Sequence, residues 1–260
     1  MACKRADATV GDITLQIDGA LATLQLANPG KANALSLRML GQLGEHLETV
    51  AADERVRVLV LRGTSGGTFS SGADISDWAP MAPDQFARDW IEYGNAVFHR
   101  FEQLRCPTVA AIEGLCFGGG LELALCADLR VGSVAARFRF PEVTIGAMPG
   151  WEGGERLARI AGRSRALEAV LTSRVIDAET AGHWGLLNAA WPAADFESRL
   201  TDLIGTLTRV SPAAARWAKA AIVGNADPRE FYPRATAALK SSRDAALGIE
   251  AFFAKKSAIF

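Results

Sequence analysis

Apolar and polar residues alternate near the beginning of the chain. Every second residue is apolar over 13–17, and the same period returns over 22–26, after Gly19. A period of two predicts half-buried strands, so these two stretches indicate a β-hairpin. After Ser36, apolar residues recur at spacings of three and four up to Val50, which predicts a helix with one apolar face.

Two later stretches, 56–61 and 109–112, are almost continuously apolar, as expected of strands covered on both faces. We expect further short strands at 128–131 and 138–140, and a long helix over 84–104. Beyond residue 155 the pattern is helical, and the predicted helices span 155–172, 178–184, 195–209, 212–224 and, in two pieces, 229–255. Asp177, Asp195 and Ser211 stand where N-caps are expected.

These elements predict an α/β fold that ends in helices. Trp191-Pro192 marks the expected boundary, which divides the chain into a mixed core over 1–192 and a helical region over 193–260.

The most distinctive stretch is 106–128, where an apolar run, three glycines at 118–120 and a predicted helix over 121–127 follow one another. Successive glycines leave unshielded N–H groups at a helix N-terminus, where negative charge is favoured. Glu122 follows in the first turn. A carboxylate beside such a site suits a reaction that develops charge on a carbonyl oxygen. The same pattern also fits a phosphate-binding loop.

Composition narrows the possible functions. The 260 residues include 28 Lys and Arg against 29 Asp and Glu, so the net charge of −1 offers no electrostatic footprint for nucleic acid or an anionic membrane. No apolar run approaches the ~20 residues of a membrane span. Four irregularly spaced cysteines and three histidines favour neither disulfides nor a metal site. With no sign of a signal or transit peptide, we expect a cytoplasmic protein.

Four motifs in order carry a resemblance to a known family: S-S-G-A-D-I at 70–75, C-F-G-G-G-L-E-L-A-L-C-A-D at 116–128, F-P-E-V-T-I-G at 140–146 and P-G-W-E-G-G-E-R-L at 149–157. Together with G-I-E-A-F-F-A-K-K at 248–256, they resemble the crotonase superfamily, the enoyl-CoA hydratase and isomerase group. The resemblance implies a spiral of β-β-α turns. It also implies terminal helices that join subunits into trimers, often paired as hexamers.

The resemblance further implies a coenzyme A thioester as substrate, with no separate cofactor. The N–H groups of Ala73 and Gly119 would form the oxyanion hole, and Gly150 would orient a water molecule. Glu122 and Glu142 match the two catalytic carboxylates of family hydratases. The coenzyme would lie against Lys31, Ala32, Ser71, Gly72, Asp74 and Ile75, and Lys255 would reach a phosphate, commonly from a neighbouring subunit.

Hydration of an α,β-unsaturated thioester needs a base for the attacking water and an acid for Cα. By resemblance, Glu142 is the donor to Cα and Glu122 holds and activates water. A Δ3–Δ2 enoyl-CoA isomerase, which needs one carboxylate, is the nearest alternative, and other acyl-CoA reactions occur on this scaffold. A non-catalytic acyl-CoA binder or an RNA-binding relative is an alternative of another class.

Two departures from the family pattern concern the substrate and the acid–base pair. Trp151 replaces a smaller residue and would reshape the acyl pocket. Trp78 and Trp90 would either line the same pocket or pack in the core or an interface. Glu152 stands where glycine is usual, and would either perturb the two carboxylates or point to solvent. The three histidines fall outside the expected site, and Cys116 is expected to be a small buried residue rather than a nucleophile.

Overall fold

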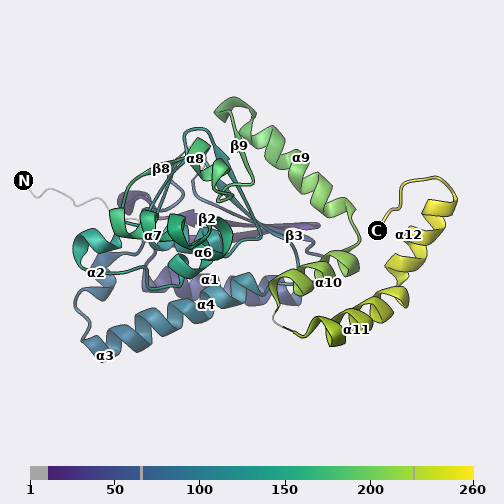
Figure 1. Ribbon diagram of the computed structural model, residues 1–260, viewed down its shortest axis with the longest axis horizontal. Helices are drawn as coiled ribbons and strands as arrows, with labels where there is room; N and C mark the ends of the chain where they lie inside the picture. The colour runs from purple at the N-terminus through teal and green to yellow at the C-terminus, as the bar shows by residue number, and fades with distance from the viewer. Residues whose placement is uncertain (1–10, 65–66, 225) are drawn as a thin grey trace, which may run out of the picture.

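The computed structural model describes residues 11–64, 67–224 and 226–260 (Figure 1). Its main sheet has six strands in the order β1-β2-β3-β4-β6-β9. The predicted hairpin is confirmed, since β1 (Asp12–Asp18) and β2 (Leu21–Ala27) pair antiparallel. From β2 onwards the neighbours are parallel, through β3 (Val58–Arg62), β4 (Thr108–Ile112), β6 (Leu129–Ser133) and β9 (Ala189–Trp191).

A second sheet of three short strands holds β5 (Leu115–Phe117), β7 (Arg137–Arg139) and β8 (Ile176–Asp177). The sequence predicted β7 but not β5, β8 or β9. Each of these three strands has only two or three residues, which is too short for a period of two to be seen.

The two faces of the main sheet bury different partners. Leu59, Leu61 and Ala110 join the larger core, which includes helix α1 (Leu37–Ala52) and helix α4 (Tyr93–Glu102). The predicted apolar face of α1 is buried, and its N-cap, Ser36, accepts a hydrogen bond from the N–H of Met39. On the opposite face, Val58, Val60 and Val109 pack with the first turns of helix α9 (Phe196–Arg209).

The predicted helix over 84–104 is interrupted rather than uniform. It consists of α3 (Pro83–Gln85), a π-helical stretch over Phe86–Glu92, and α4. A preceding short helix, α2 (Ile75–Trp78), was not predicted. Its N-cap is Asp74, whose carboxylate accepts a hydrogen bond from the N–H of Ser76. A wide π turn shifts the side chains that follow it around the helix axis, which a fixed 3.6-residue period does not anticipate.

Four further helices lie between β5 and β9 along the chain: α5 (Gly119–Leu125), α6 (Gly153–Ala161), α7 (Arg163–Thr172) and α8 (Ala178–His183). The single helix predicted over 155–172 is wrong, because Gly162 adopts φ +88° and divides it into α6 and α7. Asp177 caps α8 as predicted. Asp195 precedes α9 but its side chain makes no capping hydrogen bond.

Of the remaining helices, α10 (Pro212–Val223) contacts the body of the molecule, where Lys219 lies 2.7 Å from Asp128, whereas α11 (Pro228–Lys240) and α12 (Arg243–Phe253) extend away from it (Figure 1). These three helices leave large apolar side chains in contact with solvent, including Ile222, Phe252 and Phe253, each more than three-quarters exposed. The extended arm therefore consists of α11 and α12. The boundary after residue 192 stays a prediction. Within the described ranges, no helix is long and apolar enough to span a membrane.

Candidate active site

A cavity of about 120 Å³ opens where four loops of the core meet. Its walls come from the segment before α2, the N-terminus of α5, the turn after β7 and the loop before α6. Most of the predicted site residues line it: Ser71, Gly72, Ala73, Ile75, Gly119, Glu122, Glu142 and Gly150. Trp78 and Trp90 also line the cavity, which is one of the two predicted alternatives. The sequence motifs, up to 80 residues apart along the chain, therefore converge on one hollow.

The predicted oxyanion donors, Ala73 and Gly119, lie next to each other. An ideal Cβ built on Gly119 would be 3.3 Å from the nitrogen of Ala73. In the described part of the chain, neither N–H has a hydrogen-bond acceptor. Two adjacent unpaired N–H groups on the wall of an apolar cavity are suited to a carbonyl oxygen that gains negative charge.

Gly118 is required at the start of α5 for two reasons. Its backbone has φ +48° and ψ −128°, a conformation that residues with a Cβ rarely adopt. A Cβ there would also approach Oε1 of Glu142 to 2.9 Å. The glycine thus lets the chain turn into α5 beside the Glu142 carboxyl.

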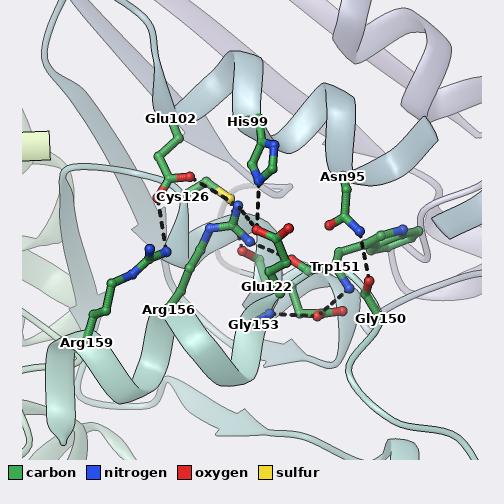
Figure 2. Close-up of polar contacts among 11 residues, drawn as sticks. Asn95, His99, Glu102, Glu122, Cys126, Gly150, Trp151, Gly153, Arg156 and Arg159 are labelled. Atoms are coloured by element: carbon green, nitrogen blue, oxygen red, sulfur yellow. Dashed lines mark hydrogen bonds and ion pairs between the residues drawn. The ribbon is translucent and has the colours of Figure 1, made fainter. Parts of the chain in front are cut away.

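Glu122 projects from the first turn of α5 and is 2% exposed. Its Oε1 accepts hydrogen bonds from the N–H groups of Trp151, at 2.8 Å, and Gly153, at 3.0 Å (Figure 2). Gly153 is the first residue of α6, so this carboxylate also caps the positive end of that helix.

The pKa of Glu122 is raised to about 8, first by burial and then by the neighbouring Glu142 carboxylate. The two N–H groups and the charge of Arg156 oppose that rise. The two hydrogen bonds hold the Glu122 carboxyl in place. Because its pKa is raised, this carboxyl retains a proton at neutral pH more readily than an ordinary glutamic acid does.

Glu142 occupies a different setting, a 3₁₀ turn over Glu142–Ile145. Its Oε2 is buried and lacks a hydrogen-bond partner within the described residues. Burial raises the pKa of Glu142 to about 7. A buried carboxyl oxygen without a protein partner, facing a cavity, is available to a substrate or to water.

A polar network that the sequence did not predict supports the loop 150–153. Asn95, His99 and Glu102 point from one face of α4 towards this loop and Arg156 (Figure 2). Nδ2 of Asn95 donates to the carbonyl oxygen of Gly150 at 3.1 Å, and Arg156 donates to Glu102 at 3.1 Å. The spacings of four and three on α4 are a signal that was visible in the sequence.

Glu152 and His99 belong to this network. Nε2 of His99 lies 2.7 Å from Oε2 of Glu152, and Glu152 is not among the residues that line the cavity. His99 does not line the cavity, as expected, but it contacts Glu152 in the loop beside it, which the sequence did not predict. Of the two alternatives for Glu152, the structure shows a partly exposed carboxylate held by partners outside the cavity.

Trp151 is almost fully buried and packs against Trp90 and Phe98, with ring centroids 5.3 Å and 5.1 Å away. Its Nε1–H donates to the carbonyl oxygen of Trp90. A Cβ on Gly119 would come within 2.4 Å of this ring, so the indole lies directly against the start of α5. Trp151 thus forms a rigid aromatic wall of the cavity.

The residues expected to contact coenzyme A form a second group beside the cavity mouth. Nζ of Lys31 lies 2.6 Å from Oδ2 of Asp74 and 2.8 Å from Oγ of Ser76, and the Ser71 hydroxyl donates to the carbonyl oxygen of Lys31. Ala32, in the same loop, has φ 48°. Lys255 follows α12 on the extended arm and does not line the cavity.

Comparison with known proteins agrees with this geometry. Residues 16–257 match the family model described as Enoyl-CoA hydratase/isomerase.

The chain belongs to the enoyl-CoA hydratase/isomerase family.

Among curated relatives of this family member, the probable enoyl-CoA hydratase 2, mitochondrial, of Arabidopsis thaliana is 32% identical over 94% of this chain and 82% of its own length. The short-chain-enoyl-CoA hydratase of Clostridium acetobutylicum is 31% identical over 82% of this chain and 81% of its own. The crystal structure of an enoyl-CoA hydratase from Bacillus anthracis superposes with a TM-score of 0.89 at 29% identity, covering 95% of this chain and 98% of that one. The crotonase fold expected from the motifs is confirmed.

Proposed function

We propose that this protein is an enoyl-CoA hydratase, which adds water reversibly across the double bond of a trans-2-enoyl-CoA thioester. The observation that carries the proposal is the carboxyl pair, Glu122 and Glu142, buried in one cavity beside the unpaired N–H groups of Ala73 and Gly119. An isomerase needs one such carboxyl, whereas hydration uses two. Curated relatives named as hydratases support the same conclusion.

The proposed reaction begins with the thioester oxygen between the N–H groups of Ala73 and Gly119. Glu122, in its ionised form, takes a proton from water as the water oxygen bonds to Cβ. The electrons of the double bond move towards Cα and the thioester oxygen, where the two N–H groups stabilise the charge. Glu142 then gives its proton to Cα. Glu122 has gained one proton and Glu142 has lost one, so the atoms balance. Transfer of a proton back from Glu122 to Glu142 restores the starting state.

This scheme requires one proton shared by the pair. Burial raises the pKa of both carboxyls, to about 8 for Glu122 and about 7 for Glu142, which favours a singly protonated pair near neutral pH. Catalysis uses the form in which Glu142 carries the proton and Glu122 is ionised.

Coenzyme A is proposed to bind along Lys31, Ala32 and the segment 71–75, since their loops border the cavity. Assembly is proposed to be a homotrimer or a dimer of trimers. The exposed apolar side chains of α10–α12 support an interface, because this much unburied apolar surface is uncommon on a monomer. Lys255 would then approach the coenzyme of a neighbouring subunit. A cytoplasmic location remains a proposal.

The proposed activity is tested by mixing purified protein with trans-2-butenoyl-CoA, longer linear and aromatic trans-2-enoyl-CoAs, and a 3-enoyl-CoA. Hydration removes the conjugated absorbance and adds the mass of one water. The proposal expects hydration of at least one trans-2-enoyl thioester, with little isomerisation of the 3-enoyl thioester. Isomerisation without hydration would instead establish the isomerase alternative, and binding without either reaction would establish the non-catalytic one.

A further inference from the structure

Glu152 adopts a backbone conformation that is unusual for its residue type. It has φ 60° and ψ 22°, in the left-handed region, and directly precedes α6. Residues with a Cβ are disfavoured there, and a charged side chain gains nothing from the backbone itself. Such a conformation persists when the surrounding contacts fix it, so the contacts of this side chain are informative.

Two side chains from different helices, His99 and Arg156, hold the Glu152 carboxylate. Nε2 of His99, on α4, lies 2.7 Å from Oε2, and Nη2 of Arg156, on α6, lies 3.4 Å from the same oxygen. Arg156 is 1% exposed, although it carries a full charge. The carboxylate thus bridges α4 to the first turns of α6.

Arg156 also binds the residue before Glu152. Its Nη1 donates to the carbonyl oxygen of Trp151 at 2.5 Å, and its Nη2 donates to Glu102 (Figure 2). One guanidinium therefore contacts the backbone of residue 151 and the side chain of residue 152. The guanidinium thus holds the peptide between residues 151 and 152, and the backbone N–H of Arg156 donates to the carbonyl oxygen of Glu152 at 3.0 Å, in the peptide that follows.

The peptide between residues 152 and 153 carries one of the two N–H groups that hold Glu122, and the peptide just before Trp151 carries the other. The N–H of Trp151 and the N–H of Gly153 flank Glu152 in sequence, and both donate to Oε1 of Glu122. With residue 152 in the left-handed region, the N–H groups on either side of it converge on one carboxylate oxygen, as N–H groups do in the anion-binding turns of other proteins.

We propose that Glu152 is a positioning residue: its bridge to His99 and Arg156 locks the left-handed turn that aims two N–H groups at Glu122. The effect on rate rests on the proposed hydratase function. The effect on Glu122 itself does not, because it can be measured without substrate.

Three substitutions at residue 152 separate the side chain's role from that of the backbone. Glu152→Gln keeps acceptor and donor atoms for His99 and Arg156, so we expect kcat within about twofold of wild type. Glu152→Ala removes the bridge but keeps a Cβ that disfavours the left-handed turn, so the Glu122 carboxylate should shift by less than 1 Å and lower kcat about 10-fold, with KM within twofold. Glu152→Gly removes the bridge but tolerates the turn, and we expect an intermediate loss. Glu155→Ala, on an exposed neighbour in α6, is the matched control.

The pH profile gives a readout that loss of folding alone would not move. The two N–H groups lower the pKa of Glu122, so loosening them should raise it and shift the acid limb of kcat to higher pH in Glu152→Ala. The groups that face Glu122 are Glu142, Arg156 and these N–H groups, and all three remain in the variant. His99→Ala should give the same shift as Glu152→Ala, and combining the two should add little.

The substrate-free test measures melting temperature against pH for Glu152→Gly and for Glu152→Gly combined with Glu122→Gln. The same comparison is made between the wild type and Glu122→Gln alone. If the pKa of Glu122 is higher in Glu152→Gly, the difference in melting temperature should keep growing up to a higher pH in the first pair than in the second. A protein that hydrates no enoyl-CoA but shows this shift would refute the hydratase proposal and keep the positioning role. Equal kcat in Glu152→Gly and wild type, with unchanged pH dependence in both assays, would overturn the positioning role.

Discussion

The carboxyls of Glu122 and Glu142 are held by different kinds of structure. Glu122 lies in the first turn of α5, every residue of which is buried, and one of its oxygens accepts two N–H groups. Glu142 begins a short 3₁₀ turn that continues through exposed residues, with Ile145 56% and Met148 72% exposed. One carboxyl is fixed by the core, while the other is carried by a surface turn.

This difference assigns the two carboxyls different tasks. A base that must hold water at one position gains from rigid support and from fixed N–H donors. A proton donor that must follow Cα as the carbon changes geometry gains from an oxygen without a protein partner. The contrast supports the roles proposed for Glu122 and Glu142, and the following changes test it.

Glu142→Gln should have the largest effect. Glutamine keeps the shape of the side chain but has no acidic proton for Cα, so hydration should fall by about 10³-fold, within the range for loss of a general acid. Because Oε2 of Glu142 has no hydrogen bond to lose, the melting temperature should stay near that of wild type. Stopped-flow hydration and calorimetry check both expectations. A large loss of stability would show that this carboxyl is part of the structural support.

Glu122→Gln should lower hydration by at least about 10²-fold, because an amide is a poor base for water. Its oxygen can still accept the N–H groups of Trp151 and Gly153, so the fold should persist. Substrate affinity should change little, since the coenzyme contacts lie elsewhere. Near-wild-type turnover in this variant, together with rapid isomerisation of a 3-enoyl-CoA, would favour the isomerase alternative.

The pH dependence of stability tests the raised pKa of Glu122. The pKa of Glu122 rises from an ordinary value of 4.5 to about 8 on folding, so the folded state binds more protons between these values. Stability should therefore fall as pH rises from about 4.5 and level off above about 8. Glu122→Gln should remove the Glu122 part of this fall in melting temperature, while the part due to Glu142, whose pKa is raised to about 7, should remain. Parallel curves for the two proteins would contradict the raised pKa.

Lys255→Ala should have the smallest effect, since this residue is remote from both carboxyls in one chain. If a neighbouring subunit presents it to a phosphate, KM should rise a few-fold with kcat unchanged, and the difference should shrink with added salt. Lys256→Ala is the neighbouring control. Light scattering should show a trimer or hexamer, and a monomer with normal KM would remove this arm from the coenzyme site.

The sequence predicted the elements whose signals are local. The apolar face of α1, the continuous run of β4 and the caps at Asp177 and Ser211 each depend on residues within a few positions of one another. The division of α6 from α7 at Gly162, by contrast, depends on one backbone angle. The two-residue strand β8 forms only because β7 lies beside it, which local sequence does not specify.

The cavity residues were predicted by resemblance of motifs, whereas their supports were not. His99 and Glu152 are 53 positions apart, and Arg156 and Glu102 are 54 apart. No spacing rule joins such residues, because the π-helical stretch and the left-handed turn decide which side chains meet. Glu152 was noticed as a departure from the family pattern, but its partners became evident only from the fold.

The pH profile of kcat/KM for a trans-2-enoyl-CoA tests the central claim, that Glu122 and Glu142 share one proton in the active form, most directly. The account predicts a bell for the wild type, with apparent pKa values near those of the pair, about 7 and about 8. In the residual activity of Glu122→Gln and of Glu142→Gln, one limb of the bell should disappear. A wild-type rate that is flat from about pH 6 to about pH 9, or a bell that survives both substitutions, would contradict it.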